Sequence, residues 1–246
     1  MIGKQCSAML RYKVITLDIH NTLMRVNQST GQQYSRVALQ HGVTLDPHIL
    51  DKAFHSALGE QRAKHPNYGI HAGMSSSAWW TDVVRKTFTT SGYSNSEVVS
   101  KIASTLYEDF KKPMTWDIFP EVKSTLTSLN RLGVCLGVIS NCDERLMEVL
   151  QATNLASHFA FILLSVYTEH EKPKPEMFRL ALDRLRVQPE ECLHVGDNIR
   201  QDYEGARAIG MDAVVVDRNQ SLAKTHPDIS SDHFIPDLTK LEMLLL

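Results

Sequence analysis

Short apolar runs alternate with stretches of helical periodicity from residue 119 onward, and this alternation limits the possible folds more than any other feature of the chain. The expected strands, all short and largely apolar, span residues 134–139, 161–164, 192–195 and 213–216. The segments of helical periodicity span residues 121–132, 143–153, 175–185 and 203–209. A further apolar run begins at Val14. Because repeated strand–helix units favour a parallel sheet with helices on both faces, the expected fold class is α/β with a Rossmann-like parallel-sheet core.

Residues 25–112 interrupt this alternation, because they show helical periodicity with almost no strand signal. One helix is expected over residues 32–40, ending before Gly42, and the next from residue 47 through residue 58. Helix-start signals occur at Asp46-Pro47, at Ser76 or Ser77, and in the Ser-x-x-Glu capping box of residues 94–97, which opens a helix to about residue 110. The sequence therefore predicts a core formed by residues 1–24 and 113–246, with an inserted helical domain over residues 25–112.

The bulk composition narrows the class of partner. The chain of 246 residues is 43% hydrophobic, which suffices for a sizeable core, and its 26 basic and 28 acidic residues give a formal net charge of −2. This balance gives no electrostatic reason to expect nucleic acid or an anionic membrane as partner. No apolar run reaches the length of a membrane span. A small-molecule substrate is therefore expected, and the sequence says nothing of oligomeric state.

The cysteines and the N-terminus indicate a reducing compartment. The four cysteines show no C-x-x-C spacing, and Cys135 and Cys192 lie in apolar runs typical of buried free thiols. Residues 1–13 lack the apolar stretch of a secretory signal. Three basic residues precede the first acidic one, but the segment is short and runs directly into the first strand. A cytoplasmic location is expected, with a mitochondrial or nuclear location left open.

Polar residues lie at the ends of several of these apolar runs. Asp18, Ser140 and Gly196-Asp197 each follow an expected strand, Lys172 lies just ahead of a helix, and Asp202 comes five residues after Asp197. Ligands collect at the carboxyl ends of the strands in open α/β sheets, so we expect these groups to converge. Two carboxylates without a histidine or cysteine cluster favour Mg²⁺ over zinc.

The order of these groups resembles that of the haloacid dehalogenase superfamily. The matching motifs are Asp18 to Thr22, Ser140, Lys172 with Pro173, and Gly196-Asp197 through Asp202. The resemblance covers nearly the whole chain and implies that residues 25–112 are an inserted helical cap domain. The 24 residues between Lys172 and Asp197 leave no room for the cap that other members carry later in the chain.

The resemblance also implies an activity, namely that of a phosphatase acting on a small phosphorylated metabolite. Asp18 would attack phosphorus and form an aspartyl-phosphate that water then hydrolyses. Lys172 would offset the negative charge of Asp18 and of the phosphoryl group. Mg²⁺ would be held by Asp18, Asp197, Asp202 and the backbone carbonyl of His20. Hydrogen bonds to the phosphoryl group would come from Thr22, Ser140 and Asn141.

His20 departs from the superfamily's pattern, because active phosphatases carry a second aspartate two residues after the nucleophile as general acid and base. Histidine, with an ordinary pKa of about 6.5, can serve as both near neutral pH or as neither. Two alternatives therefore stay open. One is a weak or inactive member that binds a phosphorylated ligand or a protein partner. The other is a haloacid dehalogenase, although dehalogenases generally lack the metal-binding Gly-Asp present at Gly196-Asp197.

A polar loop, a pair of tryptophans and one cysteine near the expected site each allow a structural explanation. The polar loop 65–73 can line a substrate pocket or be a solvated loop. Trp79 and Trp80 point about 100° apart on a helix, so one is expected in the core and the other at its edge or at the interface between cap and core. Cys142 lies beside Ser140 but has no evident histidine partner, and a bystander role is expected.

Overall fold

The structure, a computed structural model, describes residues 10–245 and contains a six-stranded parallel sheet. In spatial order its strands are β5 (Phe161–Leu164), β4 (Cys135–Ser140), β1 (Val14–Leu17), β6 (Cys192–Gly196), β7 (Asp212–Val216) and β8 (Phe234–Ile235). The chain begins at the centre, adds strands on one side, and then returns to add strands on the other, which is the Rossmann order. The predicted fold class is confirmed, and β8 is an edge strand that the sequence analysis missed.

Helices cover both faces of this sheet, and successive residues of β1 point to opposite faces. Ile15 packs in one apolar cluster and Val14 in another. Helices of the first cluster are α5 (Val122–Arg131), α6 (Arg145–Ala152) and α11 (Leu241–Leu244). Helices of the second are α8 (Pro175–Leu185) and α9 (Gly205–Arg207). Burial on both faces explains why these strands read as continuous apolar runs in the sequence.

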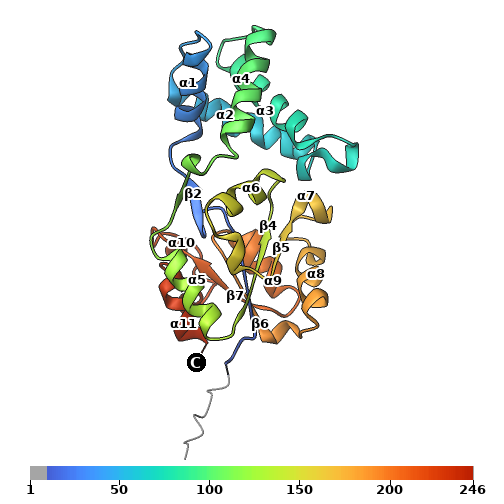
Figure 1. Ribbon diagram of the computed structural model, residues 1–246, viewed down its shortest axis with the longest axis vertical. Helices are drawn as coiled ribbons and strands as arrows, with labels where there is room; N and C mark the ends of the chain where they lie inside the picture. The colour runs from blue at the N-terminus through green and yellow to red at the C-terminus, as the bar shows by residue number, and fades with distance from the viewer. Residues whose placement is uncertain (1–9, 246) are drawn as a thin grey trace, which may run out of the picture.

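Four further helices pack around an apolar core of their own. They are α1 (Thr30–Gln40), α2 (Pro47–Lys64), α3 (Ser76–Thr90) and α4 (Ser96–Asp109), and we call them, with their connecting loops, the helical unit. Their buried side chains, among them Tyr34, Trp79 and Phe88, form a cluster separate from those of the sheet. The helical unit lies at one end of the molecule, next to α6 and α7 (Ser165–Thr168) (Figure 1).

A two-stranded antiparallel ribbon connects the helical unit to the sheet. It consists of β2 (Met24–Val26) and β3 (Trp116–Ile118), and the Asn27 backbone N–H extends it by donating to the Thr115 carbonyl at 3.0 Å. The expectation of almost no strand signal between residues 25 and 112 was wrong at this point, and β3 was also missed. Three-residue strands are too short to show the alternation by which a half-buried strand is recognised.

The predicted helix boundaries differ from the structure at several places. The helix expected to end at residue 58 continues to Lys64, and Gly59 lies inside α2 rather than after its end. Asn95 caps α4, so the capping box expected to begin at residue 94 is not the cap. The helix expected over 203–209 is a π-helical segment, Ile199–Glu204, followed by α9.

The helix α3 also begins one residue earlier than expected. Ser75, rather than Ser76 or Ser77, accepts the backbone N–H of Ala78 at 3.2 Å and is the N-cap. Shorter helical elements are α10 (Leu222–Thr225) and the 3₁₀ segments Asn67–Ala72, Pro113–Thr115, Ala156–His158, Pro189–Glu191, Ser231–His233 and Leu238–Lys240.

Within residues 10–245, no helix has both the length and the apolar character needed to cross a membrane. The interpretation of the N-terminal segment rests mainly on residues 1–9, which lie outside the described residues, as does Cys6. The other three cysteines are free thiols.

Candidate active site

Asp18 lies one residue beyond the end of β1, at the point where the order of the sheet reverses. Its side chain is buried, with 7% of the residue exposed. Ser140 Oγ donates to Asp18 Oδ1 at 2.9 Å, and Lys172 Nζ donates to the same oxygen at 2.7 Å. Among the described residues, no donor contacts Oδ2 of Asp18. The carboxylate is therefore held by one oxygen, while the other remains free to react.

Lys172 is a buried ammonium group whose hydrogen bonds are fully used. Its three N–H groups donate to Asp18 Oδ1 at 2.7 Å, to the Ile139 carbonyl at 2.7 Å and to Asp202 Oδ1 at 2.6 Å. Burial alone would lower the pKa of Lys172, but Asp18 and Asp202 raise it overall, so the group stays charged. Lys172 thus fixes two carboxylates, and it would have to give up a bond before contacting a substrate.

Asp202 belongs to a buried chain of polar groups that continues away from Asp18. His194 Nε2 lies 3.0 Å from Asp202 Oδ1, and Thr16 Oγ1 lies 2.8 Å from His194 Nδ1. The Asn198 backbone N–H donates to Asp202 Oδ2 at 3.0 Å. Burial would raise the pKa of Asp202, but Lys172 and His194 hold it well below its ordinary value. Burial lowers the pKa of His194, which favours the neutral ring.

Asp18, Asp197 and Asp202 form an acidic cluster, in which one oxygen from each lies within 4.8 Å of the others. Burial, together with the negative charges of Asp18 and Asp202, raises the pKa of Asp197 to about 7. Three carboxylates thus face one ammonium group, Lys172, and a divalent cation would relieve the remaining repulsion. An all-oxygen donor set fits Mg²⁺. The residues present therefore fit the metal that the sequence predicts.

His20 and Asn21 follow Asp18 in the chain by two and three residues. Asn21, in the left-handed region with a φ of 56°, donates its side-chain amide to Asp197 Oδ2 at 3.2 Å. His20 is exposed, and its ring packs edge-to-face against Trp116 with centroids 5.9 Å apart. Although the residue as a whole is exposed, partial burial of its ring lowers the pKa of His20, and Asp18 opposes this shift. The direction of this shift favours the neutral imidazole.

Thr22 and Asn141, both expected to bind the phosphoryl group, differ in the hydrogen bonds that their side chains make. Thr22 is fully buried, and its hydroxyl has no hydrogen-bond partner among the described residues. The Asn141 side-chain amide donates to the Lys172 carbonyl at 2.9 Å and accepts the Lys172 backbone N–H at 2.7 Å. Phosphoryl contacts by either residue stay a prediction, but Asn141 clearly holds the loop that carries Lys172.

Cys142 lies close to the site without the properties of a nucleophile. Its Sγ is 3.2 Å from Ser140 Oγ. Burial, reinforced by the charge of Asp18, raises the pKa of Cys142 to about 12. Because the thiolate is the reactive form, a thiol held in the protonated state is chemically inert.

Arg145 is a second buried cation, located where the helical unit meets α6. It pairs with Asp143 through Nε to Oδ1 at 2.9 Å and Nη2 to Oδ2 at 2.7 Å. Its guanidinium carbon lies 4.9, 4.4 and 5.9 Å from the ring centroids of Trp80, Tyr107 and Phe110. Trp80 Nε1 also donates to Asp143 Oδ2 at 2.7 Å. Aromatic residues of the helical unit therefore surround an ion pair of the sheet domain.

The neighbouring Glu144 strengthens this interface. Its two carboxylate oxygens accept the hydroxyls of Ser76 at 2.7 Å and Tyr107 at 2.6 Å. The prediction for the two tryptophans is confirmed, since Trp79 is buried in the core of the helical unit, with 1% exposed, whereas Trp80 reaches across the interface.

The loop 65–73, for which a pocket-lining role and a solvated loop were both open, contacts the residues that follow β4 and β5. Asn67, Tyr68 and Gly69 all have positive φ, at 46°, 57° and 71°. Tyr68 donates its hydroxyl to the Asn141 carbonyl at 3.1 Å, and the Asn67 amide donates to the Ser165 carbonyl at 2.8 Å. The loop thus reaches the ends of β4 and β5, and contact with a substrate there stays a prediction.

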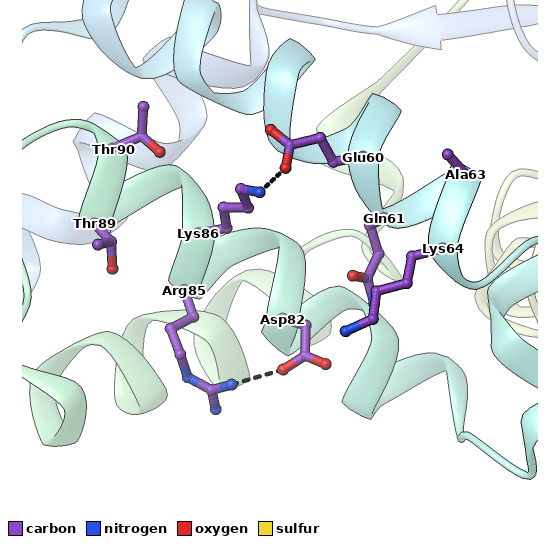
Figure 2. Close-up of a pocket in the computed structure, with 9 residues that line it drawn as sticks. All are labelled: Glu60, Gln61, Ala63, Lys64, Asp82, Arg85, Lys86, Thr89 and Thr90. Carbon is purple, nitrogen blue, oxygen red and sulfur yellow. Dashed lines mark hydrogen bonds and ion pairs between the residues drawn. The ribbon is translucent and has the colours of Figure 1, made fainter.

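A groove of about 880 Å³ on the helical unit has a different character (Figure 2). It lies between α2 and α3, and its charged groups are partly paired with one another, Glu60 with Lys86 and Asp82 with Arg85. None of its lining residues contacts Asp18 or the acidic cluster. We therefore place the active site at Asp18 and not in this groove.

The chain is similar to known hydrolases over most of its length. Residues 12–210 match the family model of haloacid dehalogenase-like hydrolases. Haloacid dehalogenase-like hydrolase domain-containing protein 3 of Bos taurus is 36% identical over 233 residues, which cover 94% of this chain and 93% of the relative. The chain belongs to the haloacid dehalogenase-like hydrolase family.

Solved structures of this family share the fold. The 2-haloacid dehalogenase from Pseudomonas syringae pv. Tomato DC3000 is 25% identical, with a TM-score of 0.64 over 95% of this chain and 97% of that one. The putative hydrolase YfnB from Bacillus subtilis, a magnesium-bound structure, has a TM-score of 0.72 at 16% identity over 95% of this chain and 99% of that one. The latter supports the fold alone.

His194 and Arg145 were not singled out by the sequence analysis. A signal for His194 was present, because a polar side chain inside a buried strand requires a hydrogen-bond partner. No comparable signal marked Arg145, since its partners Trp80, Tyr107 and Phe110 lie far away in the sequence.

Proposed function

We propose that this hydrolase is a Mg²⁺-dependent phosphatase of a small phosphorylated metabolite, with residues 25–112 acting as its cap. The observation that carries the proposal is the pairing of a restrained Asp18 carboxylate with the acidic cluster. Ser140 and Lys172 fix one oxygen of Asp18 and leave the other free. The cluster it forms with Asp197 and Asp202 suits a divalent cation, which would bring a phosphoryl group to that free oxygen.

The reaction proceeds in two displacements on phosphorus. Asp18 Oδ2 attacks phosphorus, the bond to the leaving oxygen breaks, and the departing alcohol takes up a proton. Water then attacks the aspartyl-phosphate, loses a proton, and releases phosphate and free Asp18. We assign these proton transfers to His20, which follows Asp18 by two residues in the chain. Lys172 and Ser140 keep Asp18 oriented throughout.

Bound Mg²⁺ would offset the charge of the phosphoryl oxygens and of the carboxylates. Asp18, Asp197, the carbonyl of His20 and Asp202 would hold it. Asp202 already receives hydrogen bonds from Lys172, His194 and Asn198. We therefore expect Asp18 and Asp197 to be the stronger ligands and Asp202 to orient the site.

One observation favours haloacid dehalogenation as a second candidate. His20 replaces the second aspartate of phosphatases, and dehalogenases, which attack carbon, lack that aspartate too. The 25% identity to a 2-haloacid dehalogenase agrees with this possibility. Gly196-Asp197 and the acidic cluster favour phosphate instead. A weak or inactive member that binds a phosphorylated ligand or protein partner is the remaining alternative.

The test is to titrate Mg²⁺ while measuring phosphate release from a panel of phosphorylated metabolites and from p-nitrophenyl phosphate. We expect Asp18→Asn to abolish turnover. We expect His20→Asp to raise it by about 10²-fold, because general acid–base catalysis typically contributes at least that much. Asp183→Asn, which changes an exposed aspartate of α8, is the matched control and should leave turnover unchanged.

The outcomes separate the three candidates. Unchanged turnover in Asp18→Asn would contradict the nucleophile assignment. Halide release from 2-haloacids without added metal would replace the phosphatase proposal by dehalogenation. Absence of phosphate release even in His20→Asp, across the whole panel, would favour the binding alternative.

A further inference from the structure

A continuous line of buried polar groups runs from β1 through β6 to the reactive carboxylate. Thr16, His194 and Asp202 have exposed fractions of 1%, 0% and 2%. Each successive pair is within hydrogen-bond distance, 2.8 Å from Thr16 to His194 and 3.0 Å from His194 to Asp202. Lys172 then links Asp202 to Asp18. The geometry therefore connects the Thr16 hydroxyl to the nucleophile through three intermediate side chains.

Only one assignment of hydrogens to His194 satisfies both of its neighbours when the ring is neutral. Asp202 Oδ1 is a carboxylate oxygen and can only accept, so His194 Nε2 must carry the hydrogen. Nδ1 then has a free lone pair, and the Thr16 hydroxyl donates to it. Thr16 thus selects the imidazole tautomer that donates to Asp202, in the way that outer partners orient ligating side chains at metal sites.

We propose that His194 is a positioning residue for the hydrolase reaction: by donating from Nε2 it fixes Asp202, which in turn holds the Lys172 ammonium against Asp18. This inference rests on the proposed phosphatase function. Without His194, Asp202 Oδ1 loses one of its two donors, and only Lys172 at Oδ1 and the Asn198 N–H at Oδ2 still hold the carboxylate. Because the Lys172 ammonium donates to both Asp202 and Asp18, it shifts with Asp202, and its hydrogen bond to Asp18 weakens.

The packing around Asp202 shows that its position is set closely. A Cβ atom at Gly196 would lie only 2.1 Å from Asp202 Cγ, so the carboxylate occupies space that a side chain would otherwise fill. On the other side, the Phe178 ring contacts the His194 ring edge-to-face with centroids 5.1 Å apart. The strand and α8 therefore confine both partners, and the hydrogen bond between them sets the remaining rotation.

The first test compares His194→Phe with His194→Gln in the full-length protein. Phenylalanine keeps a planar ring but removes both nitrogens, whereas glutamine offers an N–H near the position of Nε2. With p-nitrophenyl phosphate and Mg²⁺, we expect His194→Phe to lower kcat by about 10- to 100-fold with little change in KM, the usual effect of losing an outer partner. We expect His194→Gln to recover most of that loss.

The second test reads the tautomer without activity. In ¹⁵N NMR spectra of the wild-type imidazoles, the signal that disappears in His194→Gln should show a proton on Nε2. Thr16→Val, which removes the hydroxyl donor at similar volume, should lower kcat several-fold. Thr87→Val is the matched control, because Thr87 is equally buried but bonds only the Val83 carbonyl of its own helix.

Three results would overturn the positioning role while leaving the phosphatase proposal intact. They are wild-type kcat in His194→Phe, an equal loss in His194→Phe and His194→Gln, or an unprotonated Nε2. A fourth result would have a different meaning. If the wild-type protein neither binds Mg²⁺ in calorimetry nor releases phosphate, both the proposed function and the positioning role are refuted.

Discussion

Lys172 and Arg145 are both buried cations, with 2% and 8% of the residue exposed, but different groups compensate their charges. Lys172 contacts two carboxylates, Asp18 and Asp202, in a cluster where negative charge stays in excess. Arg145 contacts one carboxylate, Asp143, and the faces of three aromatic rings. The first arrangement leaves charge for a ligand to neutralise, whereas the second is already balanced.

The difference shows how one short stretch of chain, from the end of β4 to the start of α6, can contribute both to the candidate site and to assembly. Ser140 at the end of β4 donates to Asp18, and only five residues later Arg145 contacts the aromatic rings of the helical unit. A guanidinium suits an interface because it pairs bidentately and stacks on aromatic faces. An ammonium, with three compact donors, suits a site that must hold several oxygens at once. Replacing each cation by methionine should therefore produce opposite patterns of damage.

The largest effect is expected for Lys172→Met. The change removes the cation that orients Asp18 and leaves the three carboxylates unopposed, so we expect kcat/KM to fall by about 10³-fold, as for loss of a principal electrostatic group. Steady-state kinetics with p-nitrophenyl phosphate measures this. Arg145→Met serves as the comparison, and an equal loss of kcat/KM in both variants would contradict the division between the two cations.

Arg145→Met should mainly affect stability. Asp143 would remain buried without its partner, and breaking a buried pair typically costs about 3 kcal/mol in the free energy of unfolding. Urea unfolding checks this, and hydrogen exchange should show faster opening of α3 and α4 relative to the sheet. Arg179→Met changes an exposed arginine of α8 and should leave both measurements unchanged. A free energy of unfolding within 0.5 kcal/mol of wild type, about the usual effect of a surface substitution, would show that the aromatic faces alone hold the interface.

The last effect is a pH dependence that reports the excess charge around Lys172. The pKa of Asp197 is about 7 in the folded, metal-free protein and about 3.8 when unfolded, so the unfolded state loses this proton first as the pH rises. Asp197 therefore destabilises the fold progressively between about pH 4 and pH 7. The Tm of wild type should fall relative to that of Asp197→Asn over this range.

Added Mg²⁺ should reverse that trend in wild type but not in Asp197→Asn. A difference in Tm that stays constant from pH 4 to pH 8 would show that the cluster carries no surplus charge. Differential scanning calorimetry in chelator and in Mg²⁺ provides both measurements.

The parts of the molecule that follow from local pattern were predictable. Apolar runs identified five of the six sheet strands, because strands buried on both faces are continuous in sequence. Motif order brought Asp18, Ser140, Lys172 and Asp202 together. The structure joins them in one chain of hydrogen bonds, in which Ser140 bonds Asp18, Asp18 bonds Lys172 and Lys172 bonds Asp202. The strands β2, β3 and β8 were missed because each has three residues or fewer.

What the sequence could not supply are contacts between distant segments. The amide of Asn141 was expected to bind substrate, yet it bonds the backbone of Lys172, a pairing that depends on how two loops meet. The cage around Arg145 requires α3 and α4 to dock on α6, which no local periodicity encodes. The role of His20 is a question of proton-transfer chemistry, and kinetics decides it.

The ribbon β2–β3 has a consequence for the evolution and engineering of the protein. Because Val26 pairs with Trp116, and Asn27 bonds Thr115, the chain leaves and rejoins the sheet domain at almost the same point. The segment between Asn27 and Thr115 is therefore an insertion whose two ends are adjacent. Such insertions tolerate exchange, because the rest of the chain need not move. One contiguous segment can therefore be exchanged as a unit while Asp18 and the strand that carries it keep their positions.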